Sequence, residues 1–120
     1  MKAVFDAAVL IDHLNAVEKA SEAIRQYDGA VSSATVIDLL SRAKTVEAQN
    51  HARDLLSLFE VVHSNDDIAE QTVSLRREKK LSPQNAVVYA TAKHLNCLLV
   101  TSNSRDFSDS WGDVKIPYKA

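Results

Sequence analysis

Residues 3–14 read AVFDAAVLIDHL, and this stretch decides the fold. A short apolar run, Ala3 to Phe5, ends at Asp6 and passes without a turn into a segment whose apolar residues follow helical spacing as far as Leu14. A strand that leads directly into a helix is typical of a parallel sheet covered by helices. The stretch therefore predicts an α/β protein with an acidic residue at the carboxyl end of its first strand.

The rest of the chain repeats this alternation. Apolar runs predict further strands at residues 30–33, 59–63, 97–101 and 113–117. Helical spacing predicts helices at residues 16–27, 35–44, 45–58, 65–80 and 83–96, with Asp28 and Gly29 ending the first of these. Because parallel strands need crossover helices on both faces of the sheet, we expect three α/β/α layers around a central, mostly parallel sheet of four to five strands. The absence of linkers and repeats predicts a single domain over residues 1–120.

The composition excludes several classes of function. Among 120 residues there are two glycines and two prolines, too few for a glycine-rich phosphate loop or for the many tight turns of a β-sandwich. The single cysteine, Cys97, cannot form an internal disulfide or a Cys-rich zinc site. No apolar run is long enough to cross a membrane, so we expect a cytoplasmic protein. The net charge is −2, and a nucleic-acid ligand would therefore require locally concentrated positive charge.

Polar side chains gather where the strands of such a sheet end. Ligands bind at this edge, because strand carboxyl ends and helix amino ends share it. The residues expected there are Asp6, Asp38, Asn85, Asn103 and Asp106. Carboxylates and amides without Cys or His form an oxygen-only set that suits a hard cation such as Mg²⁺ or Mn²⁺. Such a cation supports the hydrolysis of phosphodiester bonds.

Two of these residues also have a purely structural interpretation as parts of helix caps. Asp38 and Asn85 stand three residues after Thr35 and Ser82, and Asp67 stands three residues after Ser64. This is the spacing of a capping box, in which the two side chains satisfy free N–H groups at the helix start. Asp38 and Asn85 are therefore open to either interpretation.

Asn103, Asp106 and Asp6, the remaining residues expected at the carboxyl edge of the sheet (hereafter, with Asp38 and Asn85, the acidic-edge residues), differ in how strongly they indicate a function. Asn103 also suits a turn, and Asp106 also suits the start of a short helix. Asp6 is different, because an unpaired carboxylate at the end of a central strand is costly and a bound cation offsets that cost. A functional role is therefore favoured at Asp6.

A basic run near the middle of the chain has two interpretations. Its cations are Arg76, Arg77, Lys79 and Lys80. Positive charge is favoured in the last turn of a helix by the helix dipole alone. The alternative is a patch that contacts the phosphates of a nucleic-acid backbone. Arg105, in the loop between two of the acidic-edge candidates, is a further candidate phosphate contact.

Four segments in order resemble the motifs of PIN domains, and together they cover nearly the whole chain. They are residues 4–14, 33–40, 81–92 and 99–107, and residues 114–118 are similar to the tail of VapC-type toxins, the ribonuclease halves of bacterial toxin–antitoxin pairs. The resemblance implies an endoribonuclease dependent on Mg²⁺ or Mn²⁺ that acts on RNA. It also implies a homodimer and inhibition by a small antitoxin protein.

The resemblance assigns roles to the acidic-edge residues. Asp6 and Asp38 would be metal ligands, Asn85 and Asn103 neutral or water-mediated ligands, and Asp106 an outer acidic residue. The chain departs from the family at Asn85, where PIN domains usually have Asp, and at Asp38, where they usually have Glu. An amide brings no negative charge, which weakens the attraction for Mg²⁺. We therefore expect an attenuated nuclease, or alternatively a catalytically degenerate PIN fold that binds RNA or a protein.

A receiver-type signalling domain of similar length does not fit the sequence. Such a domain has paired acids after its first strand and a phosphoacceptor Asp after its third. Here a single acid, Asp6, follows the first strand, and none ends the strand at 59–63.

Overall fold

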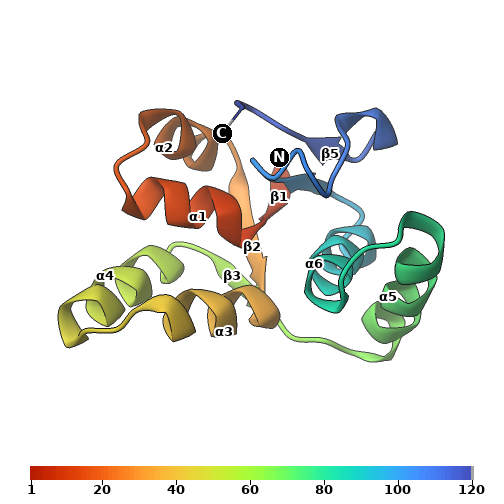
Figure 1. Cartoon of the computed structure of the whole chain (residues 1–120), viewed down its shortest axis with the longest axis horizontal. Coiled ribbons are helices and arrows are strands. Elements are labelled where there is room, and N and C mark those ends of the chain that lie inside the picture. The colour runs from red at the N-terminus through yellow and green to blue at the C-terminus, as the bar shows by residue number, and fades with distance from the viewer. Residues whose placement is uncertain (120) are drawn as a thin grey trace.

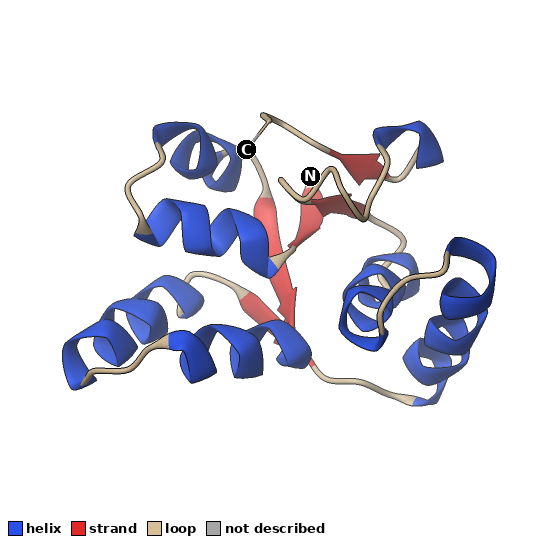
Figure 2. Cartoon of the chain, in the orientation of Figure 1, coloured by secondary structure: helices blue, strands red, loops and turns tan. Residues whose placement is uncertain are grey.

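The structure, a computed structural model that describes residues 1–119, alternates short strands with helices (Figures 1 and 2). The strands are β1 (Lys2–Phe5), β2 (Asp28–Ser32), β3 (Glu60–Val62), β4 (Leu98–Val100) and β5 (Val114–Lys115). The helices are α1 (Ala7–Leu14), α2 (Glu18–Arg25), α3 (Ser33–Arg42), α4 (Val46–Leu56), α5 (Asp66–Lys79) and α6 (Pro83–His94), with a short 3₁₀ helix η1 (Asp109–Trp111). This is the alternating order that the apolar pattern predicts.

The strands form one parallel sheet in the order β3-β2-β1-β4-β5. In the central strand, Val4 lies opposite Ala30 of β2 on one side and Leu99 of β4 on the other. The chain builds outward from β1 to β3 and then returns to the far side of β1, so the order reverses between β1 and β4. Ligand sites of open parallel sheets form beside such a reversal, at the carboxyl ends of the strands. Asp6 follows β1 at this point.

Helices cover both faces of the sheet, which confirms the three-layer α/β/α architecture. Figure 1 shows α1 to α4 on one face and α5 and α6 on the other. Because side chains alternate along a strand, Ala3 and Phe5 join the core under the first group while Val4 joins the core under the second. Within residues 1–119, no helix combines the length and the apolar character needed to cross a bilayer.

Asp28 and Gly29 do not end a helix as predicted; they are the first residues of β2. Gly29 serves close packing, because a Cβ atom at this position would lie 2.5 Å from the Phe59 ring. Asp28 lies beside Lys2 of the neighbouring strand, with 3.6 Å between their charged atoms. The pattern Asp-Gly is a helix stop only where the following chain turns, and here it continues straight into the sheet.

The helix caps agree with the sequence pattern at α6 but not at α3 or α5. Ser82 caps α6 by accepting a hydrogen bond from the Asn85 N–H at 3.2 Å, as predicted. At α3 the cap is Ser32, three residues earlier than expected, and Thr35 is buried inside the first turn. At α5 the cap is Asn65 rather than Ser64. The capping interpretation of Asp38 through Thr35 is therefore wrong.

Candidate active site at the carboxyl edge

A pocket of about 270 Å³ opens at the carboxyl edge of the sheet. Four of the predicted site residues line it: Asp6, Asp38, Asn85 and Asn103. They come from four separate segments, which are the end of β1, helix α3, the first turn of α6 and the loop after β4. Helix α6 begins close to this edge because Ser82 caps it and Pro83 occupies its first turn, which places Asn85 at the pocket. The reversal in strand order thus brings together residues that are far apart in the sequence.

Asp6 is the most buried acid of the pocket, with 6% of its surface exposed. The hydroxyl of Thr101 donates a hydrogen bond to Asp6 Oδ2 at 2.7 Å, and the Asp6 N–H donates to the Val100 carbonyl at 2.9 Å. Burial raises the pKa of Asp6, and the negative charge of Asp38 raises it further, while the Thr101 hydroxyl and the N–H groups of Ala7 and Ala8 lower it. The surroundings therefore penalise the ionised carboxylate, and a cation in the pocket would relieve that penalty.

Arg42, which was not among the predicted site residues, also lines the pocket and bonds to Asp38. Its Nε donates to Asp38 Oδ1 at 2.9 Å, one helical turn away in α3. Both residues line the pocket. The sequence carried a signal for this pair in its spacing of four residues, which places two side chains on the same helix face.

Asp106 lies outside this pocket and holds two of its amides. Asn85 Nδ2 donates to Asp106 Oδ2 at 3.0 Å, and Asn103 Nδ2 donates to the same oxygen at 3.1 Å. Asn103 Oδ1 in turn accepts from the Asp106 N–H at 3.2 Å, so both ends of this amide are engaged. Because a carboxylate only accepts hydrogen bonds, Asp106 turns the Asn85 nitrogen toward itself. The Asn85 Oδ1 is then the amide oxygen that remains available to a cation.

A second pocket, of about 570 Å³, adjoins the first and collects positive charge. Its basic lining residues are Arg76, Lys79, Lys80 and Arg105. It shares the lining residues Ser82 and Asn85 with the acidic pocket, so the two pockets are neighbours. Arg77, the remaining member of the predicted basic patch, is exposed and lies outside this lining.

The donor set fits a divalent cation that is bound weakly. Within residues 1–119, no three His, Cys, Asp or Glu side chains are grouped so as to hold a metal ion. Two carboxylates, Asp6 and Asp38, and the oxygen of Asn85 face the acidic pocket. Mg²⁺ commonly uses one or two carboxylates and completes its shell with water and substrate phosphates. The chemistry of the residues therefore suits such an ion, and their charge suits only modest affinity.

The tail of the chain is fastened beside this site by Asp12. Asp12 Oδ2 accepts hydrogen bonds from the Tyr118 hydroxyl at 2.7 Å and from the Ser102 hydroxyl at 3.1 Å. Burial raises the pKa of Tyr118 to about 12, and the bond to Asp12 acts in the same direction. These partners lie 106 and 90 positions from Asp12 in the sequence, so no local pattern indicates them.

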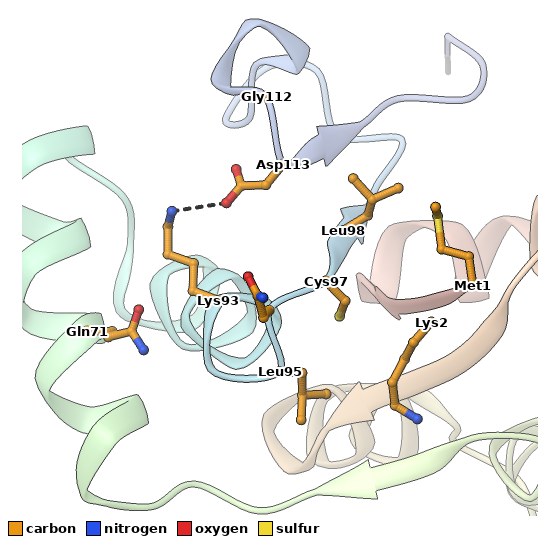
Figure 3. Close-up of a pocket in the computed structure, with 10 residues that line it drawn as sticks. Met1, Lys2, Gln71, Lys93, Leu95, Cys97, Leu98, Gly112 and Asp113 are labelled. Atoms are coloured by element: carbon orange, nitrogen blue, oxygen red, sulfur yellow. Dashed lines mark hydrogen bonds and ion pairs between the residues drawn. The ribbon is translucent and has the colours of Figure 1, made fainter.

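A pocket elsewhere in the described chain is larger than the acidic one. It encloses about 610 Å³ at the opposite, amino edge of the sheet, where Lys2 and Leu98 line it. Figure 3 shows its one marked ion pair, between Lys93 Nζ and Asp113 Oδ2 at 3.0 Å. This pair joins α6 to the segment before β5, and the pocket holds no cluster of acids. Size alone therefore does not identify the functional site.

The PIN domain family profile matches residues 3–110. The chain belongs to the PIN domain family. Among solved structures, a toxin–antitoxin complex from Klebsiella pneumoniae contains a chain that is 32% identical, with a TM-score of 0.91 over 98% of this chain and 99% of that one. No curated protein sequence matches the chain closely enough to count as a relative.

More distant structures share the PIN domain's fold. FitAcB from Neisseria gonorrhoeae is 18% identical, with a TM-score of 0.78 over 96% of this chain and 97% of that one. DNA-bound VapBC from Salmonella typhimurium is 21% identical, with a TM-score of 0.74 over 89% and 90%. The resemblance of the four sequence segments to PIN domains is confirmed by the family profile.

Proposed function

We propose that this PIN domain is a metal-dependent endoribonuclease of the VapC toxin type that hydrolyses RNA phosphodiester bonds at an attenuated rate. The observation that carries the proposal is that two pockets of opposite charge lie next to each other and share the lining residues Ser82 and Asn85. One holds Asp6 and Asp38, and the other holds Arg76, Lys79, Lys80 and Arg105. A polyanionic strand lying in the basic pocket would present one of its phosphates to the acidic pocket.

Each part of the site then has a separate task. The cations of the basic pocket bind the backbone phosphates on one side of the cleavage position. Asp6, Asp38 and the Asn85 oxygen would hold Mg²⁺ or Mn²⁺, and Thr101 and Asp106 fix the orientation of these side chains through their hydrogen bonds. When bound, the cation supplies an activated water and stabilises negative charge on the phosphate. The missing charge at Asn85 weakens the hold on the cation and so lowers the rate.

The family supports a proposal for the biological setting of this chain. We propose that a small antitoxin protein inhibits this PIN domain in the cytoplasm and that the toxin acts as a homodimer. Support for the antitoxin comes from the 32% identical chain, which is part of a toxin–antitoxin complex. A pull-down from cells that express this chain with the protein encoded beside it tests the partner, and sedimentation of the purified chain tests the dimer.

A second function is favoured by the charge of the acidic pocket. Asn85 contributes no charge, and Arg42 neutralises Asp38. So little net negative charge at the site favours a PIN domain that binds RNA or a protein without cutting it. Cleavage and binding are separable measurements, so the two functions lead to different results.

The test compares cleavage of structured RNA with and without Mg²⁺. We expect slow, Mg²⁺-dependent cleavage by the native chain and none by Asp6→Asn, in which the isosteric amide retains an acceptor for Thr101. Asp54→Asn is the matched control, because Asp54 is an exposed acid of α4 and its loss leaves the site intact. Binding of RNA with no cleavage by the native chain would favour the second function. Cleavage that survives Asp6→Asn would overturn the site.

A further inference from the structure

Within the described part of the chain, Arg42 is the only basic residue that lines the acidic pocket. Its guanidinium bonds directly to Asp38, one of the two carboxylates that would hold a cation there, with 2.9 Å between Nε and Oδ1. With Asp6 and Asp38 ionised, the pocket carries two negative charges, and Arg42 reduces the net charge to one. A divalent cation and Arg42 therefore compete for the same carboxylate.

A cation can compete with Arg42 for Asp38 because the Arg42–Asp38 ion pair is weak. The Arg42 side chain is 62% exposed and that of Asp38 20% exposed. Pairs of this kind, one helical turn apart and open to water, contribute little to stability. Arg42 is also free to leave without unfolding α3, since it occupies the last turn and its side chain is held by no other ion pair within residues 1–119. A modest competing interaction is enough to displace it.

A phosphate group is the competitor best suited to Arg42. The recorded contact with Asp38 uses Nε, and guanidinium N–H groups bind phosphate oxygens in pairs with geometry that a single carboxylate contact does not match. An RNA strand in the basic pocket would bring its next phosphate to the acidic pocket, because the two cavities share Ser82 and Asn85. The same phosphate would then meet Arg42.

We propose that Arg42 couples cation binding to RNA binding. Without RNA, Arg42 occupies Asp38 and keeps the affinity for a divalent cation low. With RNA, a backbone phosphate draws the guanidinium away and Asp38 becomes available to the cation. By linkage, cation and RNA each increase the affinity for the other by the same factor. The inference rests on the proposed function, since it requires a divalent cation at Asp6 and Asp38.

The test measures Mn²⁺ affinity of the full chain by electron paramagnetic resonance, alone and with a short oligouridylate whose phosphorothioate linkages resist cleavage. We expect Arg42→Gln without the oligonucleotide to bind Mn²⁺ about three- to tenfold more tightly than the native chain, because a competing unit charge is lost. The oligonucleotide should strengthen Mn²⁺ binding to the native chain several-fold more than to Arg42→Gln.

Two variants control for charge and for folding. Arg42→Lys retains the positive charge and should stay close to the native Mn²⁺ affinity. Arg25→Gln removes another exposed cation, from the last turn of α2, and should leave Mn²⁺ binding unchanged. A purely structural role of Arg42 would lower stability in both Arg42 variants without tightening Mn²⁺ binding, and this result would overturn the inference.

The Asp6→Asn variant separates failure of the inference from failure of the proposed function. If Asp6→Asn loses Mn²⁺ binding while Arg42→Gln matches the native chain in both conditions, the coupling is wrong and the cation site stands. If Asp6→Asn binds Mn²⁺ as the native chain does, the cation site itself is wrong, and the coupling falls with it.

Discussion

Asn85 and Asp106 form a pair whose chemistry explains why an amide is tolerated at position 85. The Asn85 nitrogen lies 3.0 Å from Asp106 Oδ2, and this bond is favourable because the carboxylate accepts from an N–H donor. A carboxylate at position 85 would instead place two negative oxygens in contact. Without a cation between them, two such groups repel each other and destabilise the fold.

The first prediction is that Asn85→Asp is less stable than the native chain in the absence of divalent cations. We expect a loss of about 1 kcal/mol, from the lost hydrogen bond and the new repulsion with Asp106. Mg²⁺ should reverse this loss and raise the rate of RNA cleavage, because the added charge strengthens the cation site. Urea unfolding with EDTA and with Mg²⁺ measures the first effect.

The double variant Asn85→Asp with Asp106→Asn provides the control. It exchanges the two groups, so the hydrogen bond between positions 85 and 106 is restored with its polarity reversed. Because Asn103 Nδ2 shares the same Asp106 oxygen and loses this acceptor, the stability in EDTA should recover only in part. If Asn85→Asp were equally stable with and without Mg²⁺, the two positions would not share an electrostatic site, and Asn85 could not be the cause of attenuation.

At the scale of single elements, β2 depends on a glycine for its packing rather than for a turn. Gly29 lies opposite Ala3 in the sheet, and the Phe59 ring covers it. Phe59 also packs edge-on against Phe5, with 5.5 Å between the ring centroids, so the ring has little room to retreat. Position 29 therefore requires a residue without a side chain, because the Phe59 ring occupies the space that a Cβ atom would need.

The second prediction is that Gly29→Ala destabilises the fold by about 1–3 kcal/mol, the usual cost of forcing extra volume into a packed core. The new Cβ would meet the Phe59 ring at 2.5 Å. Urea unfolding measures the change. Adding Phe59→Leu removes the clash, so the double variant should lose less stability than the two single losses combined. Additive losses would show that Gly29 and Phe59 are not coupled.

The C-terminal tail is a second element fixed by one polar contact. Tyr118 donates to Asp12, and its pKa in the folded chain is about 12 against an ordinary value of 10.0. Because the folded state holds this proton more tightly than the unfolded state does, the contribution to stability is complete below pH 10. It is lost as the pH rises from 10 to 12.

The third prediction is that Tyr118→Phe lowers stability by about 1 kcal/mol at neutral pH, the typical net contribution of one hydrogen bond. The difference between the native chain and the variant should vanish between pH 10 and 12. Urea unfolding across that range measures it. Tyr27→Phe is the control, since the Tyr27 hydroxyl makes no hydrogen bond within residues 1–119, and a pH-independent difference for Tyr118→Phe would contradict the assignment.

The sequence predicts what depends on local pattern and misses what depends on contacts across the fold. The strand that ends at Asp6 and the helix capped by Ser82 follow from neighbouring residues alone. The role of Gly29 depends on Phe59, thirty positions away, and no local signal separates it from a turn glycine. The same is true of the candidate site, where the sequence predicts which residues meet but not the hydrogen bonds between them.

The topology of a parallel sheet places Asp6, Asp38, Asn85 and Asn103 at one edge, and for this reason sequence reasoning brings them together. Their hydrogen bonds are a different matter. That Asp106 holds two amides follows only from the shape of the loop after β4. Arg42 was predictable from its spacing to Asp38, but spacing alone does not show that the pair faces the pocket.

At the scale of the whole molecule, a net charge of −2 conceals a strong separation of charge. The acids of the first pocket and the cations of the second lie on the same rim, at the carboxyl edge of the sheet. Four positive side chains surrounding one cavity attract a polyanion even when the protein as a whole is slightly negative. Part of this charge also serves the fold, since Lys79 lies over the Trp111 ring at 4.6 Å. Arg76 and Arg105 are therefore the better probes of ligand binding.

The fourth prediction is that Arg76→Gln and Arg105→Gln weaken RNA binding while Arg77→Gln does not. Arg77 is the neighbour of Arg76 on α5 and has the same charge, but it lies outside the basic pocket. Each phosphate contact with a single strand contributes about 0.7 to the slope of log K against log salt. Binding of single-stranded RNA in EDTA, measured by fluorescence anisotropy over a range of salt concentrations, should therefore give a slope reduced by about this amount for each pocket variant.

Arg77→Gln is decisive because it separates local charge from net charge. If binding responds only to the total charge of the chain, all three variants lose affinity equally. Their salt slopes then do not differ from one another. If the basic pocket guides the strand to the acidic pocket, Arg77→Gln matches the native chain and the pocket variants also cleave more slowly at low RNA concentration. Equal losses in all three would remove the argument that the two pockets act on one strand, because attraction would then be a property of the surface as a whole.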